Sequence, residues 1–117
     1  MNPGPAADAL YLDQILERIA SIRKGVETLS LDAFRSDRDK VDATAFRLAM
    51  IGEASHKLSG EFKARHPGIP WELIYRQRNI VVHAYDSIKA EVIWAVVNKD
   101  LDLLEAVCRD ELKRLDS

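Results

Sequence analysis

Three side chains that can act on a phosphate ester, Arg78, Asn79 and His83, lie within six consecutive positions. An arginine offers fixed donors to phosphoryl oxygens, and a histidine can move a proton near neutral pH. In RNA the adjacent 2′-hydroxyl is the nucleophile, so these groups could cleave the strand without a metal ion. In this interpretation His83 moves the proton, Arg78 stabilises charge on the phosphoryl oxygens, and Asn79 orients the histidine or the substrate.

The spacing of these residues restricts how they can meet. On an α-helix, Arg76, Asn79 and His83 share one face, whereas Arg78 and His83 lie about 140° apart around the axis and about 7.5 Å apart along it. They can converge on one ligand if the arginine side chain curls across the helix, or if a second chain presents the same helix. An arginine and a histidine five positions apart are common on helices, so the spacing alone favours a surface arginine with a histidine that caps the helix.

Two helices are predicted before this stretch. Apolar residues recur at spacings of three and four over residues 8–29 and form the stripe Leu12, Ile15, Ile19, Ile22, Val26 and Leu29. The next helix is predicted to begin after an N-cap at Ser36 and to stop at Gly60. Its inner residues become small toward its end, so another backbone can approach closely there. They are Val41, Ala45, Leu48, Gly52 and Ser55.

The rest of the chain is also predicted to be helical. A short turn over residues 61–65 precedes the helix-breaking segment 66–70, and Pro70 suits the first position of a helix that runs to Ala84. Asp86–Ser87 is predicted as the break and cap before one long final helix. Its apolar stripe comprises Ile93, Val97, Leu101, Leu104, Cys108, Leu112 and Leu115, widened by Val92, Val96, Leu103 and Val107.

These patterns predict an all-α fold, an antiparallel bundle of four to five helices. Residues 1–117 are expected to form one domain, with residues 1–7 as a flexible N-terminal segment. The last helix has more apolar surface than one small bundle covers, which favours a homodimer. Trp71 and Trp94 are expected to anchor the core or an interface.

Composition limits the classes of partner and compartment. The chain has 17 basic and 19 acidic residues, so nucleic acid would have to bind a local patch, such as residues 63–78 with a local charge of +3. The lone Cys108 cannot form an internal disulfide, and no segment is predicted to be a signal peptide or a membrane span. We therefore expect a cytoplasmic protein. His56 and His66 lack the spacing of a metal site, and no metal or other cofactor is expected.

The segment from Arg78 to Tyr85 resembles the Arg-x4-His-x-Tyr signature of HepT-like toxins, a branch of the HEPN (higher eukaryote and prokaryote nucleotide-binding) superfamily. The resemblance extends to Ile51-Gly52-Glu53-Ala54, to Ile69-Pro70-Trp71, and to the length and helix order. It implies a HEPN-like helical bundle that forms a homodimer, or a higher even oligomer, in which the signature helices of two chains meet at a composite cleft. An acidic residue often precedes the signature tyrosine, where this chain has Ala84.

The resemblance also implies a function. It indicates a metal-independent RNA endonuclease that acts as the toxin of a type VII-like toxin–antitoxin pair, with Arg78 and His83 as catalytic residues. Its antitoxin would be a nucleotidyltransferase of the MNT type that adds AMP to Tyr85, which would place a nucleotide and a negative phosphodiester beside the catalytic residues.

Other interpretations of these residues stay open. Glu53 could orient the basic residues across the bundle or form an ordinary surface ion pair, and Arg76 and Asn79 could bind RNA or only solvent and backbone. Tyr85 could simply pack its ring and leave its hydroxyl in water. The alternative function is a non-catalytic helical dimer that binds a nucleotide or docks a nucleotidyltransferase.

Overall fold

The computed structural model describes residues 5–116, and within them every regular element is helical, so the all-α prediction is confirmed. The helices are α1 (Pro5–Val26), α2 (Leu31–Ser36), α3 (Arg38–His56), α4 (Gly60–Arg65), α5 (Trp71–Ala84), α6 (Ala90–Lys99) and α7 (Leu101–Asp116), with a 3₁₀ turn at Tyr85–Ser87. Residues 1–4, part of the expected flexible segment, lie outside the described residues, and α1 begins at Pro5. No described helix has the length and apolar character that crossing a membrane requires.

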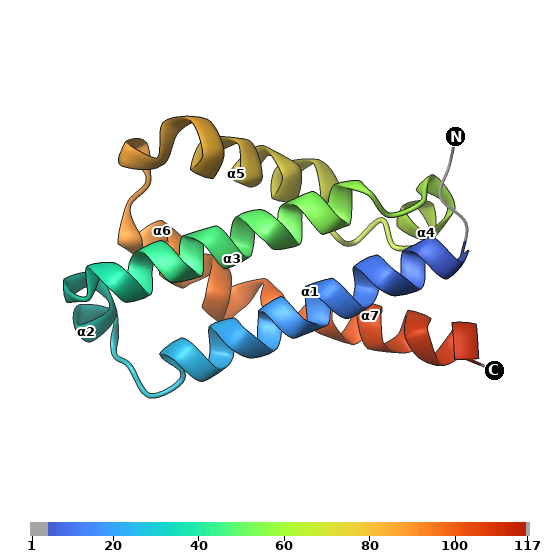
Figure 1. Cartoon of the computed structure of the whole chain (residues 1–117), viewed down its shortest axis with the longest axis horizontal. Helices are drawn as coiled ribbons and strands as arrows, with labels where there is room; N and C mark the ends of the chain where they lie inside the picture. The colour runs from blue at the N-terminus through green and yellow to red at the C-terminus, as the bar shows by residue number, and fades with distance from the viewer. Residues whose placement is uncertain (1–4, 117) are drawn as a thin grey trace.

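Helix α3 lies at the centre of the bundle (Figure 1). Antiparallel to it, α1 packs on one side and α5 on the other, and α7 packs along α1. The predicted stripe of α1 forms the middle of the core, because Leu12, Ile15, Ile19 and Ile22 are fully buried. Burial of this stripe removes apolar surface from water and is the main force that holds α1 in the bundle.

Several predicted helix ends were wrong, because residues with similar capping propensity stand close together. Ser36 is the last residue of α2, and Asp37 caps α3 by accepting a hydrogen bond from the Lys40 amide at 3.2 Å. Gly60 does not stop α3, which ends at His56, but begins α4. Helix α2 itself has only six residues and an N-cap at Ser30, and no apolar period distinguished it.

The predicted final helix is divided in two at Asp100. Helix α6 packs against α2 and α3, whereas α7 packs against α1. The division lets Ile93 and Leu104 both become buried although they face different neighbours. Asp86 and Ser87 do form a break, but Lys89 occupies the N-cap position of α6 and provides no side-chain cap.

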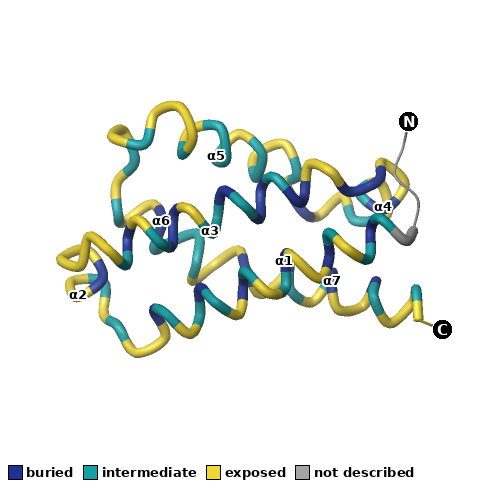
Figure 2. Tube along the Cα trace, viewed as in Figure 1, coloured by how far each residue is buried: buried dark blue, intermediate teal, exposed yellow. Residues whose placement is uncertain are grey.

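Helix α5 forms an outer layer over α3 and contains no buried residue, as the tube in Figure 2 shows. It approaches α3 most closely at Gly52. A Cβ atom built on Gly52 would lie 2.7 Å from Cβ of Arg78 and 3.1 Å from the carbonyl oxygen of Ile74. The predicted close approach at the small end of α3 is confirmed, and its partner is the helix that carries the signature.

We predict that Gly52→Ala lowers the free energy of unfolding by about 1–3 kcal/mol, because the added methyl group forces α5 away from α3. Urea denaturation followed by circular dichroism measures this change. Gly60→Ala is the matched control, since nothing lies within 4 Å of a Cβ atom there. Equal stability of the Gly52→Ala variant and the natural protein would contradict the close approach.

Candidate functional site

The α5 edge that faces α3 carries a charged pair formed by Arg78 and Glu53. Nε of Arg78 lies 2.9 Å from Oε2 of Glu53, and the two side chains are 23% and 32% exposed. Both atoms are shielded from solvent, and their alignment is that of an ion pair and not of a linear hydrogen bond. A partly buried pair of opposite charges is screened less than a surface pair, so Glu53 restrains the guanidinium against α3.

The pair extends toward the outer face of α5 through Asn79. One terminal nitrogen of Arg78 donates a hydrogen bond to Oδ1 of Asn79 at 2.9 Å. Nζ of Lys57 lies 3.8 Å from the other carboxylate oxygen of Glu53. The structure therefore brings together Glu53, Arg78 and Asn79, three of the residues expected at the site, with Lys57 beside them.

His83 and Arg76 are exposed on the outward side of α5. Among the described residues neither side chain has a hydrogen bond or ion pair, so none joins His83 to Arg78. Asn79 precedes His83 by one helical turn, so the amide links the arginine to the side of the helix on which the histidine stands. In one chain, then, the guanidinium is held by Glu53 and Asn79, and the imidazole is exposed to a ligand or a second chain.

Tyr85 stands just after α5, where its hydroxyl donates a hydrogen bond to Oδ1 of Asp42 on α3. Nε of Arg38 lies 3.1 Å from the same oxygen, and the guanidinium carbon is 5.1 Å from the centre of the tyrosine ring. Burial, followed by the hydrogen bond and the negative charge of Asp42, raises the pKa of Tyr85 to about 12. The phenol is therefore a neutral hydrogen-bond donor at physiological pH.

Sequence reasoning missed four neighbours of these residues: Arg38, Asp42, His56 and Tyr75. The rings of His56 and Tyr75 stack with centroids 3.7 Å apart, and the Arg78 guanidinium lies 5.8 Å from the Tyr75 ring. Part of this neighbourhood could have been predicted, because residues three positions apart on a helix are neighbours. Tyr75 stands three positions before Arg78, and His56 stands three positions after Glu53. No such signal exists for Asp42, which is 43 positions from Tyr85.

The basic segment 63–78 is less positive in the folded chain than its sequence suggests. Arg65 pairs with the buried Glu111 at 2.5 Å, and Arg78 pairs with Glu53. Lys63 and Arg76 line a shallow hollow at the start of α5 together with Trp71 and Glu72. Trp71 itself belongs to the packing, as expected, since its Nε1 donates to the carbonyl oxygens of Lys63 and His66.

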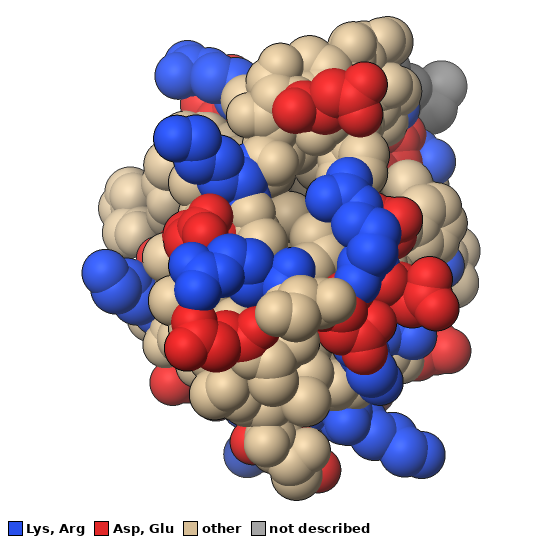
Figure 3. All heavy atoms as spheres, turned by 90° about the vertical axis from the view of Figure 1, so that its left-hand side faces the viewer, with Lys and Arg blue, Asp and Glu red and all other residues tan. Residues whose placement is uncertain are grey.

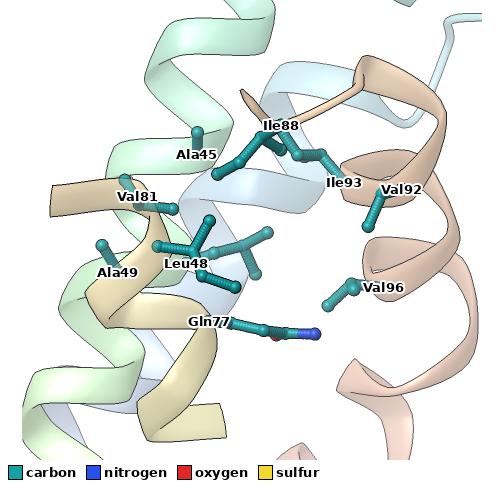
Figure 4. Close-up of a pocket in the computed structure, with 10 residues that line it drawn as sticks. Ala45, Leu48, Ala49, Gln77, Val81, Ile88, Val92, Ile93 and Val96 are labelled. Atoms are coloured by element: carbon teal, nitrogen blue, oxygen red, sulfur yellow. The ribbon is translucent and has the colours of Figure 1, made fainter. Parts of the chain in front are cut away.

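The flank of α5 away from Arg78 borders an apolar groove. Figure 4 shows one part of it, where α3, α5 and α6 present mostly aliphatic side chains. A second hollow between α5 and the start of α7 continues it, and both share Leu48, Gln77 and Val96. The rim contains exposed apolar residues from three helices: Leu73, Ile80, Val92 and Leu103. An unpaired apolar surface of this kind is typical of a protein interface.

Within residues 5–116, no three or more histidine, cysteine, aspartate or glutamate side chains are grouped so that they could hold a metal ion. The carboxylates of the site, Glu53 and Asp42, are each paired with an arginine. The arrangement offers hydrogen-bond donors, a guanidinium and an imidazole, together with these two carboxylates.

Comparison with known proteins gives consistent results. The family model described as "Ribonuclease HepT-like" matches residues 15–111. A probable ribonuclease HepT of Thermococcus cleftensis is 34% identical over 95 residues, which cover 81% of this chain and 86% of the relative. A putative RNase of Methanocaldococcus jannaschii is 32% identical over 104 residues, 86% of each chain. Another, of Caldanaerobacter subterraneus subsp. tengcongensis, is 29% identical over 104 residues, which cover 89% of this chain and 93% of the relative. No solved structure matches the chain.

Proposed function

The chain belongs to the HepT-like ribonuclease family, and on that premise we propose that it is a metal-independent RNA endonuclease whose catalytic residues are Arg78 and His83. The observation that supports this most directly is the chain of contacts from Glu53 through Arg78 to Asn79, which ends one turn before the exposed His83. It holds a guanidinium that can bind phosphate on the helix that also carries an exposed imidazole.

The proposed reaction uses the nucleophile that RNA itself contains. The 2′-hydroxyl attacks the adjacent phosphorus, the bond from phosphorus to the 5′-oxygen breaks, and His83 moves a proton in this exchange. Arg78 stabilises the charge that develops on the phosphoryl oxygens, and Glu53 keeps its guanidinium in place. Asn79 orients Arg78 and the substrate, and Arg76, on the same face as His83, binds the RNA backbone.

We further propose that the active unit is a homodimer. The apolar groove lies along the same side of α5 as Ile80, which is only about 60° around the axis from His83. A second copy seated on this groove would cover the exposed Leu73, Ile80, Val92 and Leu103 and would bring two signature helices together. The separation of Arg78 and His83 within one chain is then bridged by the partner's residues.

We also propose that the enzyme is a toxin whose partner, a nucleotidyltransferase of the MNT type, inactivates it by adding AMP to Tyr85. Tyr85 directly follows the helix that carries Arg78 and His83, and its hydroxyl is held near the surface by Asp42. A nucleotide attached there would add bulk and negative charge where the RNA backbone must lie.

The nuclease proposal predicts that Arg78→Ala and His83→Ala each reduce RNA cleavage at least about a hundredfold, because each removes a group acting in the transition state. Cleavage of labelled RNA in EDTA measures this loss. Arg109→Ala is the control, since Arg109 is an exposed arginine on α7 that pairs with its helical neighbour Glu105. Intact RNA with the pure, unmodified protein would refute the nuclease and favour a binding module.

The dimer proposal predicts that Ile80→Asp shifts the protein from dimer to monomer at micromolar concentration, because it places a charge in the apolar interface. Analytical ultracentrifugation measures the mass of each species. Leu10→Asp is the matched control, as Leu10 is also an exposed apolar residue but lies on α1, outside the groove. A monomeric natural protein at this concentration would disprove the dimer.

Modification of Tyr85 is tested by mass spectrometry after incubation with a nucleotidyltransferase of the MNT type from the same genome and ATP. We expect a mass increase of one or more AMP units on Tyr85, and none in Tyr85→Phe. RNA cleavage should fall in proportion to the modified fraction. An adduct on another residue would refute the assignment.

A further inference from the structure

Tyr85, Asp42 and Arg38 form a cluster that the nuclease reaction does not use. Two donors converge on one oxygen, Oδ1 of Asp42: the tyrosine hydroxyl and Nε of Arg38. The Asp42 and Arg38 side chains are 51% and 65% exposed, so a macromolecular partner can reach them. The cluster joins the beginning of α3 to the turn that ends the signature helix.

Attachment of a nucleotide to Tyr85 requires that its hydroxyl lose a proton. The phenol is a poor nucleophile while protonated, and its pKa of about 12 leaves a negligible fraction ionised at neutral pH. The proton must therefore leave as the new bond forms. Because the hydroxyl already donates its hydrogen to Asp42, the acceptor is in place before any partner arrives.

We propose that Asp42 is the proton acceptor for nucleotide transfer to Tyr85, an inference that rests on the proposed modification of this tyrosine. The tyrosine oxygen attacks the α-phosphorus of ATP, the bond from that phosphorus to the β-phosphate bridging oxygen breaks, and pyrophosphate leaves. The proton passes from the hydroxyl to the Asp42 carboxylate and then to water. The toxin itself thus supplies the base for its own inactivation.

Arg38 completes this acceptor site. Once the nucleotide is attached, the tyrosine oxygen is an ester oxygen that no longer donates a hydrogen bond, and a phosphodiester anion faces the Asp42 carboxylate. Among the described residues Arg38 has no other acidic partner, and its guanidinium already covers the tyrosine ring. It is therefore placed to turn from the carboxylate to the phosphate.

The surroundings of the cluster fit a site that a protein partner approaches. Figure 3 views the end of the molecule that contains α2 and the beginning of α3, and basic and acidic side chains are interspersed over it. The described residues of this face therefore form no continuous acidic surface that would repel ATP or the nucleotidyltransferase that binds it. The charged groups that act on the Tyr85 hydroxyl are Asp42 and Arg38 from α3 and Asp86 from the 3₁₀ turn.

The contact itself can be tested without a partner by following the ionisation of Tyr85 in ultraviolet absorbance, with Tyr85→Phe as the reference. At pH 10.5 about one molecule in thirty should be ionised if the pKa is about 12. Asp42→Asn removes the negative charge, so the ionised fraction should rise several-fold. Asp39→Asn, an exposed carboxylate in the same turn of α3, should leave it unchanged. An unchanged fraction in Asp42→Asn would overturn the proposal.

The chemical role is tested by the rate of transfer from ATP labelled at the α-phosphate, with Mg²⁺ and a saturating nucleotidyltransferase of the MNT type from the same genome. At pH 7.5 Asp42→Asn should be modified at least about tenfold more slowly than the natural chain, and Asp39→Asn at the natural rate. The rate difference between Asp42→Asn and the natural chain should shrink by up to about tenfold for each unit by which the pH rises. The reason is that the variant lacks the proton acceptor and can react only through Tyr85 that is already ionised, a fraction that rises with pH. Both chains meet the same nucleotidyltransferase at each pH. The ratio of the variant's rate to the natural rate is therefore unaffected by titration of groups on the nucleotidyltransferase.

The outcomes separate this inference from the proposed function. Labelling of the natural chain but not of Tyr85→Phe, together with an undiminished rate in Asp42→Asn, overturns the role of Asp42 and leaves the modification standing. A deficit that is the same at every pH also overturns it, since a merely structural change would produce that result. Absence of label on Tyr85 in the natural chain overturns both.

Discussion

The close approach of α5 to α3 at Gly52 is the constraint on which the site depends. Because Gly52 has no side chain, the Cβ atom of Arg78 and the backbone of Ile74 come within contact distance of α3. At this separation Glu53, the next residue of α3, reaches the Arg78 guanidinium. Further along the same pair of helices, Asp42 reaches the Tyr85 hydroxyl. One small residue thus sets the distance across which the Glu53–Arg78 contact forms, and the same two helices bring Asp42 and Tyr85 together.

The same packing gives α5 two different flanks. One flank is held to α3 by charged and polar contacts, and the other borders an apolar groove whose rim is exposed. Helix α5 packs Trp71, Ile74 and Val81 only partly against the core, and its remaining apolar surface is available to a partner. Within the basic segment 63–78, Arg65 and Arg78 are paired with carboxylates, and Lys63 and Arg76 line the surface at the start of α5.

Helices could be predicted from the sequence where apolar repeats or capping residues gave a clear local pattern. The stripe from Leu12 to Val26 repeats over several turns, so the position and buried face of α1 could be predicted. The end of α2 and the start of α3 depend on Ser36 and Asp37, neighbouring residues that both suit a helix cap, so no local pattern could choose between them. The division at Asp100 carries no strong breaking residue and follows from the different neighbours of α6 and α7.

For the site, the sequence by itself determined which groups lie on α5 and at what angles. The separation of Arg78 and His83, and the position of Tyr85 just beyond the helix, follow from helical geometry. Only the tertiary structure decided that Glu53 and Asn79 hold the guanidinium while His83 stays open, and that Asp42 and Arg38 enclose Tyr85. The physical reason is that Glu53, Asp42 and Arg38 belong to α3, and side chains 25 or more positions apart in the sequence can meet only through the packing of two helices.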